Sequence, residues 1–114
     1  MRLPNAEQAR VDREKLTDYL LCVGHPDGGS KAEFFTRFGF PVQDWEVLAE
    51  ALRRHGAYCD VVNTVDSAHG TRYAVDGPLE TPDGRNPLVR TVWIIEKGSA
   101  TPRLITAHPL EGPR

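Results

Sequence analysis

The hydrophobic period of this chain changes near Gly56, and this change restricts the fold more than any other feature. Before Gly56, apolar residues recur every three or four positions, as at Leu16, Tyr19 and Leu20, which is typical of amphipathic helices. After it they alternate, as in Arg90-Thr91-Val92-Trp93-Ile94-Ile95, which is typical of half-buried strands. Helices followed by strands predict the α+β class.

Capping residues predict the bounds of three helices. Asp12 and Asp44 each precede a helical pattern, and Ser30 with Glu33 forms a capping box, in which each side chain accepts a hydrogen bond from a free backbone amide. Gly56 is expected to end the third helix. The helices are expected from Asp12 to about Cys22, from Ser30 to near Gly39, and from Trp45 to His55.

Turn residues divide the second half of the chain into four strands. Thr81-Pro82-Asp83-Gly84 and Lys97-Gly98-Ser99 are typical of hairpin turns. The strands are expected at Tyr58 to Val65, Thr71 to Pro78, Leu88 to Glu96 and Arg103 to His108. We therefore predict one α+β domain over residues 1–114, with N-terminal helices packed on one face of a four-stranded antiparallel sheet.

The composition is that of an ordinary globular protein, with 39% hydrophobic and 26% charged residues. The longest apolar runs, such as Val92-Trp93-Ile94-Ile95, are far too short to cross a bilayer, and the N-terminus has no apolar core of the signal-peptide kind. We expect a cytoplasmic chain with no membrane partner. The sequence leaves the oligomeric state unknown.

Cysteine and histidine spacing indicates neither disulfides nor a metal site. Cys22 and Cys59 are too few and too far apart for a disulfide scaffold, and both are expected to be reduced. The histidines occur singly, without the paired spacing of zinc ligands, at His25, His55, His69 and His108. No nucleotide-binding loop or dinucleotide fingerprint is present, so no cofactor is expected. The helix dipole is a sufficient explanation for His55.

Charge is spread unevenly over the two halves. The net charge of −2 argues against a purely charge-driven nucleic-acid binder. Residues 1–66 hold 8 Lys+Arg and 11 Asp+Glu, whereas residues 67–114 hold 6 and 5. The strand half is therefore the part that a polyanion can approach, and an acidic helical face is more typical of contact with solvent or a basic partner.

His25 and Lys31 are candidate catalytic residues in the helical half. His25 lies in a glycine-rich connection before a helix, where an imidazole is accessible and can act as base or acid near neutral pH. Lys31 lies in the first helical turn, where acidic residues are preferred, and this misfit suggests phosphate binding. The alternatives are a helix-ending surface histidine and an ordinary solvated lysine.

Arg72, Arg90 and Trp93 are candidate substrate-binding residues in the strand half. Arg90 shares a strand face with Val92 and Ile94, so it needs either a phosphate or a carboxylate, for which Asp76 and Asp60 are candidates. Trp93 offers a ring on which a base can stack, although Trp45 and Trp93 are more typical of core anchors.

Thr106 and His108 complete the candidate catalytic set in the last strand. By simple alternation they share a face with Leu104. If Leu104 points to the core, both follow it toward the rim of a cleft between helices and sheet, where a hydroxyl and an imidazole meet a scissile phosphate. The alternative is an ordinary strand threonine and a strand-end surface histidine.

Motifs in both halves resemble an uncharacterised bacterial domain found as free-standing proteins and as C-terminal modules of polymorphic, contact-dependent toxins. They include Lys15-Leu16-x-x-Tyr19-Leu20-Leu21, His25-Pro26, Lys31-Ala32-x-x-Phe35, Arg72-Tyr73-x-Val75, Val89-Arg90-Thr91-x-Trp93 and Pro102-Arg103-Leu104-Ile105-Thr106. The layout is more loosely similar to the barnase, EndoU, colicin and RelE group of ribonucleases.

This resemblance implies metal-free RNA cleavage through a 2′,3′-cyclic phosphate, in a cleft between helices and sheet. It implies His25 as general base or acid, Lys31 and Arg90 as phosphate ligands, Thr106 as an orienting group and His108 as the opposite proton-transfer group. It also implies RNA as substrate and a cognate inhibitor or immunity protein as partner. The competing expectation is a non-catalytic interaction module that binds a protein through the same cleft.

Overall fold

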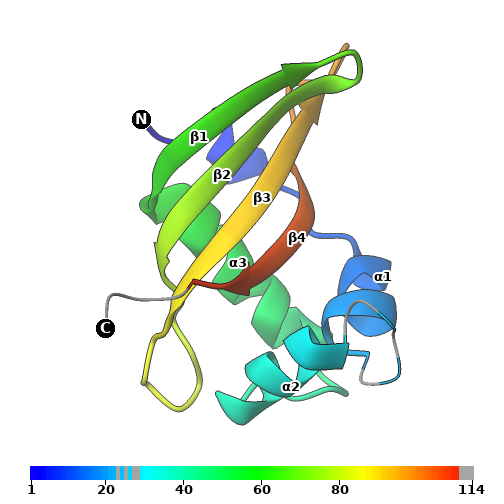
Figure 1. The fold of residues 1–114 in the computed structure, drawn as a ribbon, viewed down its shortest axis with the longest axis vertical. Coiled ribbons are helices and arrows are strands. Elements are labelled where there is room, and N and C mark those ends of the chain that lie inside the picture. Colours follow the sequence, from blue (N-terminus) through cyan, green and yellow to red (C-terminus); the bar gives the residue numbers. More distant parts are fainter. Residues whose placement is uncertain (23, 25, 27–28, 111–114) are drawn as a thin grey trace.

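The computed structural model describes residues 1–22, 24, 26 and 29–110. The N-terminal half is helical, and the strands follow it, which confirms the predicted α+β class (Figure 1). Its elements are the 3₁₀ turn η1 (Ala6–Gln8), helix α1 (Arg13–Lys15), the π-helical segment η2 (Leu16–Leu20), helix α2 (Gly29–Arg37) and helix α3 (Trp45–Tyr58). No helix within these described ranges is long and apolar enough to cross a membrane.

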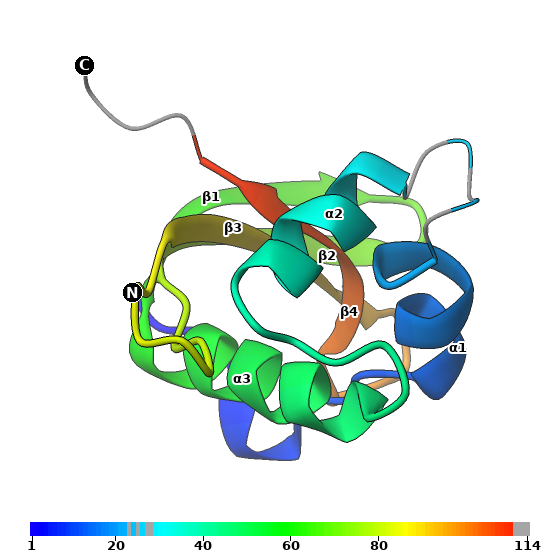
Figure 2. The same cartoon turned by 90° about the horizontal axis from the view of Figure 1, so that it is seen from below.

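The four strands form one antiparallel sheet in the order β1-β2-β3-β4. Their bounds are β1 (Asp60–Ser67), β2 (Gly70–Pro78), β3 (Leu88–Glu96) and β4 (Arg103–Pro109), each within two residues of the prediction. Helix α3 lies across one face of the sheet, whereas α1 and α2 lie beside β4 (Figure 2). The opposite face of the sheet is open in Figure 1.

The hydrophobic core lies between α3 and the sheet. Trp93 is fully buried at its centre, and Leu52 of α3 and Leu104 of β4 are also buried there. Gly56 of α3 lies against the indole ring: a Cβ atom at this position would be 2.7 Å from Cζ2 of Trp93. Gly56 therefore allows the helix to approach the sheet closely and does not end the helix, which continues to Tyr58 and corrects the predicted end at His55.

The first predicted helix differs from a regular α-helix. Only three residues are α-helical, and the backbone amide of Leu21 donates to the carbonyl of Leu16 at 2.7 Å, one residue wider than an α-helical turn. Leu16, Leu20 and Leu21 are all buried. Asp12 and Asp44 occupy N-cap positions, but neither side chain makes a capping hydrogen bond, and α2 begins at Gly29, so Ser30 already lies within it.

Strand β4 contains an irregularity that changes which side chains share a face. Thr106 pairs with Val92, but Leu104 pairs with the next residue of β3, Trp93, so Ile105 is an extra residue in the strand. A bulge of this kind interrupts alternation. Leu104 therefore points to the core while Thr106 and His108 point to the open face, and the expectation that these two follow Leu104 is wrong.

Candidate functional site

Cross-strand rows of side chains cover the sheet face opposite α3. Because residues that are in register across antiparallel strands project to the same side, the register fixes the members of each row. Two rows matter for the site. The first row consists of Asp60, Asp76, Arg90 and His108. The second row consists of Asn63, Ala74, Val92 and Thr106. The intervening row, which includes the fully buried Val75, Thr91 and Ala107, faces α3.

Both ends of the second row are positioned by irregularities. In β4 the extra Ile105 brings Thr106 to the open face. In β1 the register shifts between Val61 and Asn63, so Val62 is an extra residue and Asn63 pairs with Ala74 on the open face. Bulges are common next to active sites because they re-aim a side chain.

Thr106 connects this face to the helices beside β4. Its Oγ1 atom lies 3.0 Å from the hydroxyl oxygen of Tyr19 in η2, within hydrogen-bond distance. The Nζ atoms of Lys15 and Lys31 each lie 5.5 Å from the centroid of the Tyr19 ring. Two ammonium groups, a phenol and a threonine hydroxyl are thus gathered along the β4 margin, which is an arrangement suited to an anion.

The remaining polar candidates line a hollow of about 240 Å³ on the open face. Arg72, Arg90 and His108 contribute to its lining. Nε and Nη2 of Arg90 donate to the two carboxylate oxygens of Asp76 at 2.7 and 2.9 Å. These hydrogen bonds lower the pKa of Asp76 and raise that of Arg90. The carboxylate partner anticipated for Arg90 is therefore Asp76, whereas Arg72 has no ion-pair partner among the described residues.

The imidazole of His108 is oriented by a contact with the last residue of β4, Pro109. Its Nδ1 atom lies 3.2 Å from the carbonyl oxygen of Pro109. Because a carbonyl only accepts, Nδ1 carries the hydrogen in this contact. The neutral ring then holds its free lone pair on Nε2, which is the nitrogen able to accept a proton.

The two remaining predicted residues are His25 and Trp93. His25 lies outside the described residues. Trp93 is fully buried, and its Nε1 atom donates to Thr91 at 2.8 Å, so its ring belongs to the core and has no surface on which a base can stack. We therefore correct the assignment of Trp93 as a substrate-binding residue.

Tyr19 and Lys15 are site candidates that sequence reasoning missed. Their spacing of four residues places them on the same side of a helical turn, but Tyr19 reads as a member of the apolar stripe with Leu16 and Leu20. The signal that identifies it is the contact with Thr106, which joins residues 87 positions apart in the chain.

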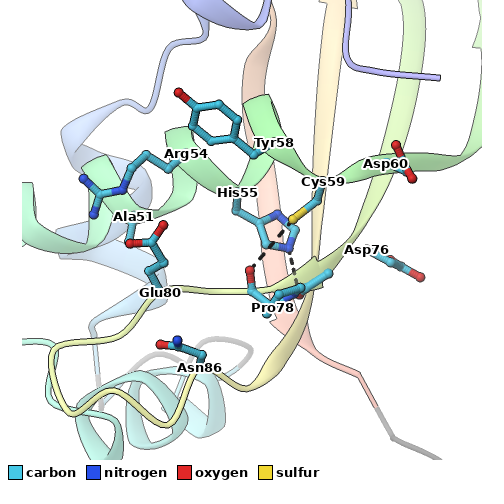
Figure 3. A pocket seen from close by; sticks show the side chains of 11 residues that line it. Ala51, Arg54, His55, Tyr58, Cys59, Asp60, Asp76, Pro78, Glu80 and Asn86 are labelled. Atoms are coloured by element: carbon cyan, nitrogen blue, oxygen red, sulfur yellow. Dashed lines mark hydrogen bonds between the residues drawn. The ribbon is translucent and has the colours of Figure 1, made fainter.

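A second cavity, of about 400 Å³, lies between the end of α3 and the end of β2 (Figure 3). His55 of α3 lines this cavity. Its Nε2 atom lies 2.9 Å from the carbonyl oxygen of Val89 and 3.1 Å from that of Gly77, so Nε2 carries the hydrogen. Nδ1 then accepts from the Thr91 hydroxyl at 2.9 Å. Burial lowers the pKa of His55, so this imidazole is a neutral, fully bonded structural group.

The rest of that cavity is poorly suited to an anion. Among the described residues that line it, three are acidic and one is basic: Asp60, Asp76 and Glu80, and Arg54. Burial raises the pKa of the nearby Cys59 thiol, which keeps it protonated and unreactive. Both cysteines are free thiols. Acid–base and phosphate chemistry is therefore better supported on the open face.

Comparison with known proteins gives a family and a fold. No curated protein matches the sequence. The structure is similar to a chain of the contact-dependent growth inhibition toxin–immunity protein complex from Klebsiella pneumoniae 342, with a TM-score of 0.71 and 20% identity over 94% of this chain and 97% of that one. At this identity the likeness shows a shared fold. The family model described as a domain of unknown function, DUF6883, matches residues 2–111, and the chain therefore belongs to that family.

Proposed function

We propose that this protein is a metal-independent endoribonuclease that acts as a bacterial toxin and is held inactive by a cognate immunity protein. The observation that carries the proposal is the Tyr19–Thr106 contact. It joins Lys15 and Lys31 from the helical half to the sheet face that bears Arg72, Arg90 and His108. Cations, hydroxyls and an imidazole on one surface are what phosphodiester transfer needs without a metal.

The reaction is transfer of the ribose 2′-oxygen to the neighbouring phosphorus. The 2′-oxygen–phosphorus bond forms, the bond from phosphorus to the 5′-oxygen breaks, and a 2′,3′-cyclic phosphate remains. His108 takes the 2′-hydroxyl proton on Nε2, the nitrogen that its contact with Pro109 leaves unprotonated. We assign the proton donor for the leaving 5′-oxygen to His25, on the basis of the sequence alone.

The cations hold the phosphate. Lys31 and Lys15 neutralise its charge beside Tyr19, and Arg72 contributes from the opposite side of the face. Arg90 uses Nε and Nη2 for Asp76, so its Nη1 hydrogens are left for a phosphate oxygen. Thr106 orients the group through its hydroxyl.

The toxin role is supported by the fold and by the sequence resemblance together. The K. pneumoniae complex contains a toxin and its immunity protein, and one of its chains has this fold over almost its whole length. A second candidate function follows from the same finding: a non-catalytic module that binds a partner protein through the open face. RNA cleavage separates the two.

The test is cleavage of total RNA in EDTA by the wild type and by Lys31→Ala, Thr106→Val and His108→Gln. Each substitution is expected to lower the cleavage rate about 100-fold or more, since each removes a charge, a hydroxyl or a proton-transfer group from the transition state. The matched controls are Lys97→Ala and His69→Gln, which change exposed residues in the hairpin turns and are expected to cleave at the wild-type rate. Intact RNA in every lane would favour the interaction module, and equal cleavage by Lys31→Ala would remove the proposed site.

A further inference from the structure

The hollow on the open face has apolar side chains in its lining. Ala74 of β2 and Val92 of β3 lie opposite each other in the register, and both are half-buried residues that line the hollow and form its floor. Val65 of β1 adds an exposed apolar side chain at its edge. A floor of small side chains on a sheet suits a planar ring, because such a ring can lie parallel to the sheet surface.

Asn63 stands at the side of this floor and offers unused hydrogen-bonding groups. It is in register with Ala74 and lines the hollow. Regular alternation from Val61 would turn it toward α3, and the extra residue Val62 turns it to the open face instead. Within the described residues its amide makes no hydrogen bond, so both the carbonyl oxygen and the NH₂ group are open to a ligand.

The rim supplies the charges that a nucleotide needs. Arg72, Arg90 and His108 line the same hollow. Thr106 continues the row of Asn63, Ala74 and Val92 toward Tyr19, so the floor and the proposed phosphate site are consecutive parts of one surface.

We infer that this hollow binds the nucleobase next to the scissile phosphate and that Asn63 reads its edge, with adenine preferred. The inference rests on the proposed ribonuclease function. An asparagine amide presents an acceptor beside a donor, which matches the exocyclic amine and N7 of adenine. RNA enzymes that read sequence do so on unstacked bases, and a shallow open face accepts a base only in that form.

The test is a change of base preference by Asn63→Asp. A carboxylate only accepts hydrogen bonds, so it loses the match to adenine and gains one to guanine, whose N1–H and N2–H donors are adjacent. In a synthetic RNA that contains every dinucleotide, the ratio of cleavage at adenine to cleavage at guanine is expected to fall at least about tenfold. The matched control is Gln8→Glu, the same chemical change at an exposed residue of η1, which packs on α3 away from the open face. The control is expected to keep the wild-type ratio.

A binding measurement on the wild type separates this inference from the proposed function. We expect 3′-AMP to shift the amide NMR signals of Ala74 and Val92 more strongly than 3′-GMP, 3′-CMP or 3′-UMP does. If RNA is cleaved, but Asn63→Asp leaves the base preference unchanged and the four nucleotides act alike, the inference is overturned and the ribonuclease stands. If 3′-AMP binds at these residues but RNA stays intact, the base site stands and the ribonuclease does not.

Discussion

The buried imidazole of His55 links α3 to two strands. It bonds Thr91 through Nδ1 and the carbonyls of Val89 and Gly77 through Nε2. Trp93 donates to the same Thr91 hydroxyl, so the network also includes the fully buried indole ring. Every buried polar side-chain atom within the described residues has a partner. The arrangement therefore requires a neutral His55 ring. A proton on Nδ1 would point at the Thr91 hydroxyl, which would then have to accept the hydrogen bond that it now donates.

This requirement predicts that the folded protein loses stability in mild acid. In the unfolded chain His55 takes up a proton near its ordinary pKa of 6.5, whereas burial lowers its pKa in the folded state. Between those two pKa values the unfolded state binds more protons, so the free energy of unfolding falls as the pH drops below 6.5. Urea unfolding at pH 7.5 and pH 5.5 measures the fall. The pKa of Asp76 is lowered by Arg90, so this carboxylate stays ionised in that interval.

NMR and a control variant test whether His55 is the group that causes this loss of stability in acid. The ring NMR signals of His55 are expected to stay unchanged from pH 7.5 to 6.5, and His69→Gln, a change at an exposed turn histidine, is expected to keep the acid sensitivity. Titration of the His55 ring with a midpoint at or above 6.5 would show that the ring is not held neutral by the fold.

At the scale of elements, the contact between α3 and β3 depends on the absence of a side chain at Gly56. We predict that Gly56→Ala destabilises the protein by about 1–3 kcal/mol, because its Cβ would meet the Trp93 ring at 2.7–2.9 Å. Helix propensity alone predicts the opposite sign, a gain of up to about 1 kcal/mol. Urea unfolding decides between them. Gly24→Ala is the control, since a Cβ there meets no atom within 4 Å, and a stabilised Gly56→Ala variant would contradict the packing.

The same element shows what sequence patterns could and could not predict. Alternation and turn residues were sufficient for the four strands and for the α+β class, because both depend on local chemistry. Gly56 has the sequence signature of a helix stop, and only the position of Trp93, far along the chain, gives it another role. The bulges at Val62 and Ile105 have no local signal here, so the faces of Asn63, Thr106 and His108 could not be predicted.

At the scale of the whole molecule, the two halves of the chain meet at one surface. The predicted residues Lys31, Thr106, Arg72, Arg90 and His108 all lie on the open face or at its β4 margin. Tyr19, which the sequence did not single out, is the residue that connects them. Composition could not predict that these cations lie together, because a net charge of −2 is a sum over the whole chain and carries no information on where the charges lie.

The most direct test of this account uses one oligonucleotide in two forms. The wild-type protein, freed of any bound partner, is incubated in EDTA with a single-stranded RNA and with the same sequence made of 2′-deoxynucleotides. The account predicts that only the RNA is cut and that the new ends carry a 2′,3′-cyclic phosphate, because the 2′-oxygen is the nucleophile. Equal cutting of both strands, or an RNA that stays intact at high protein concentration, would contradict it.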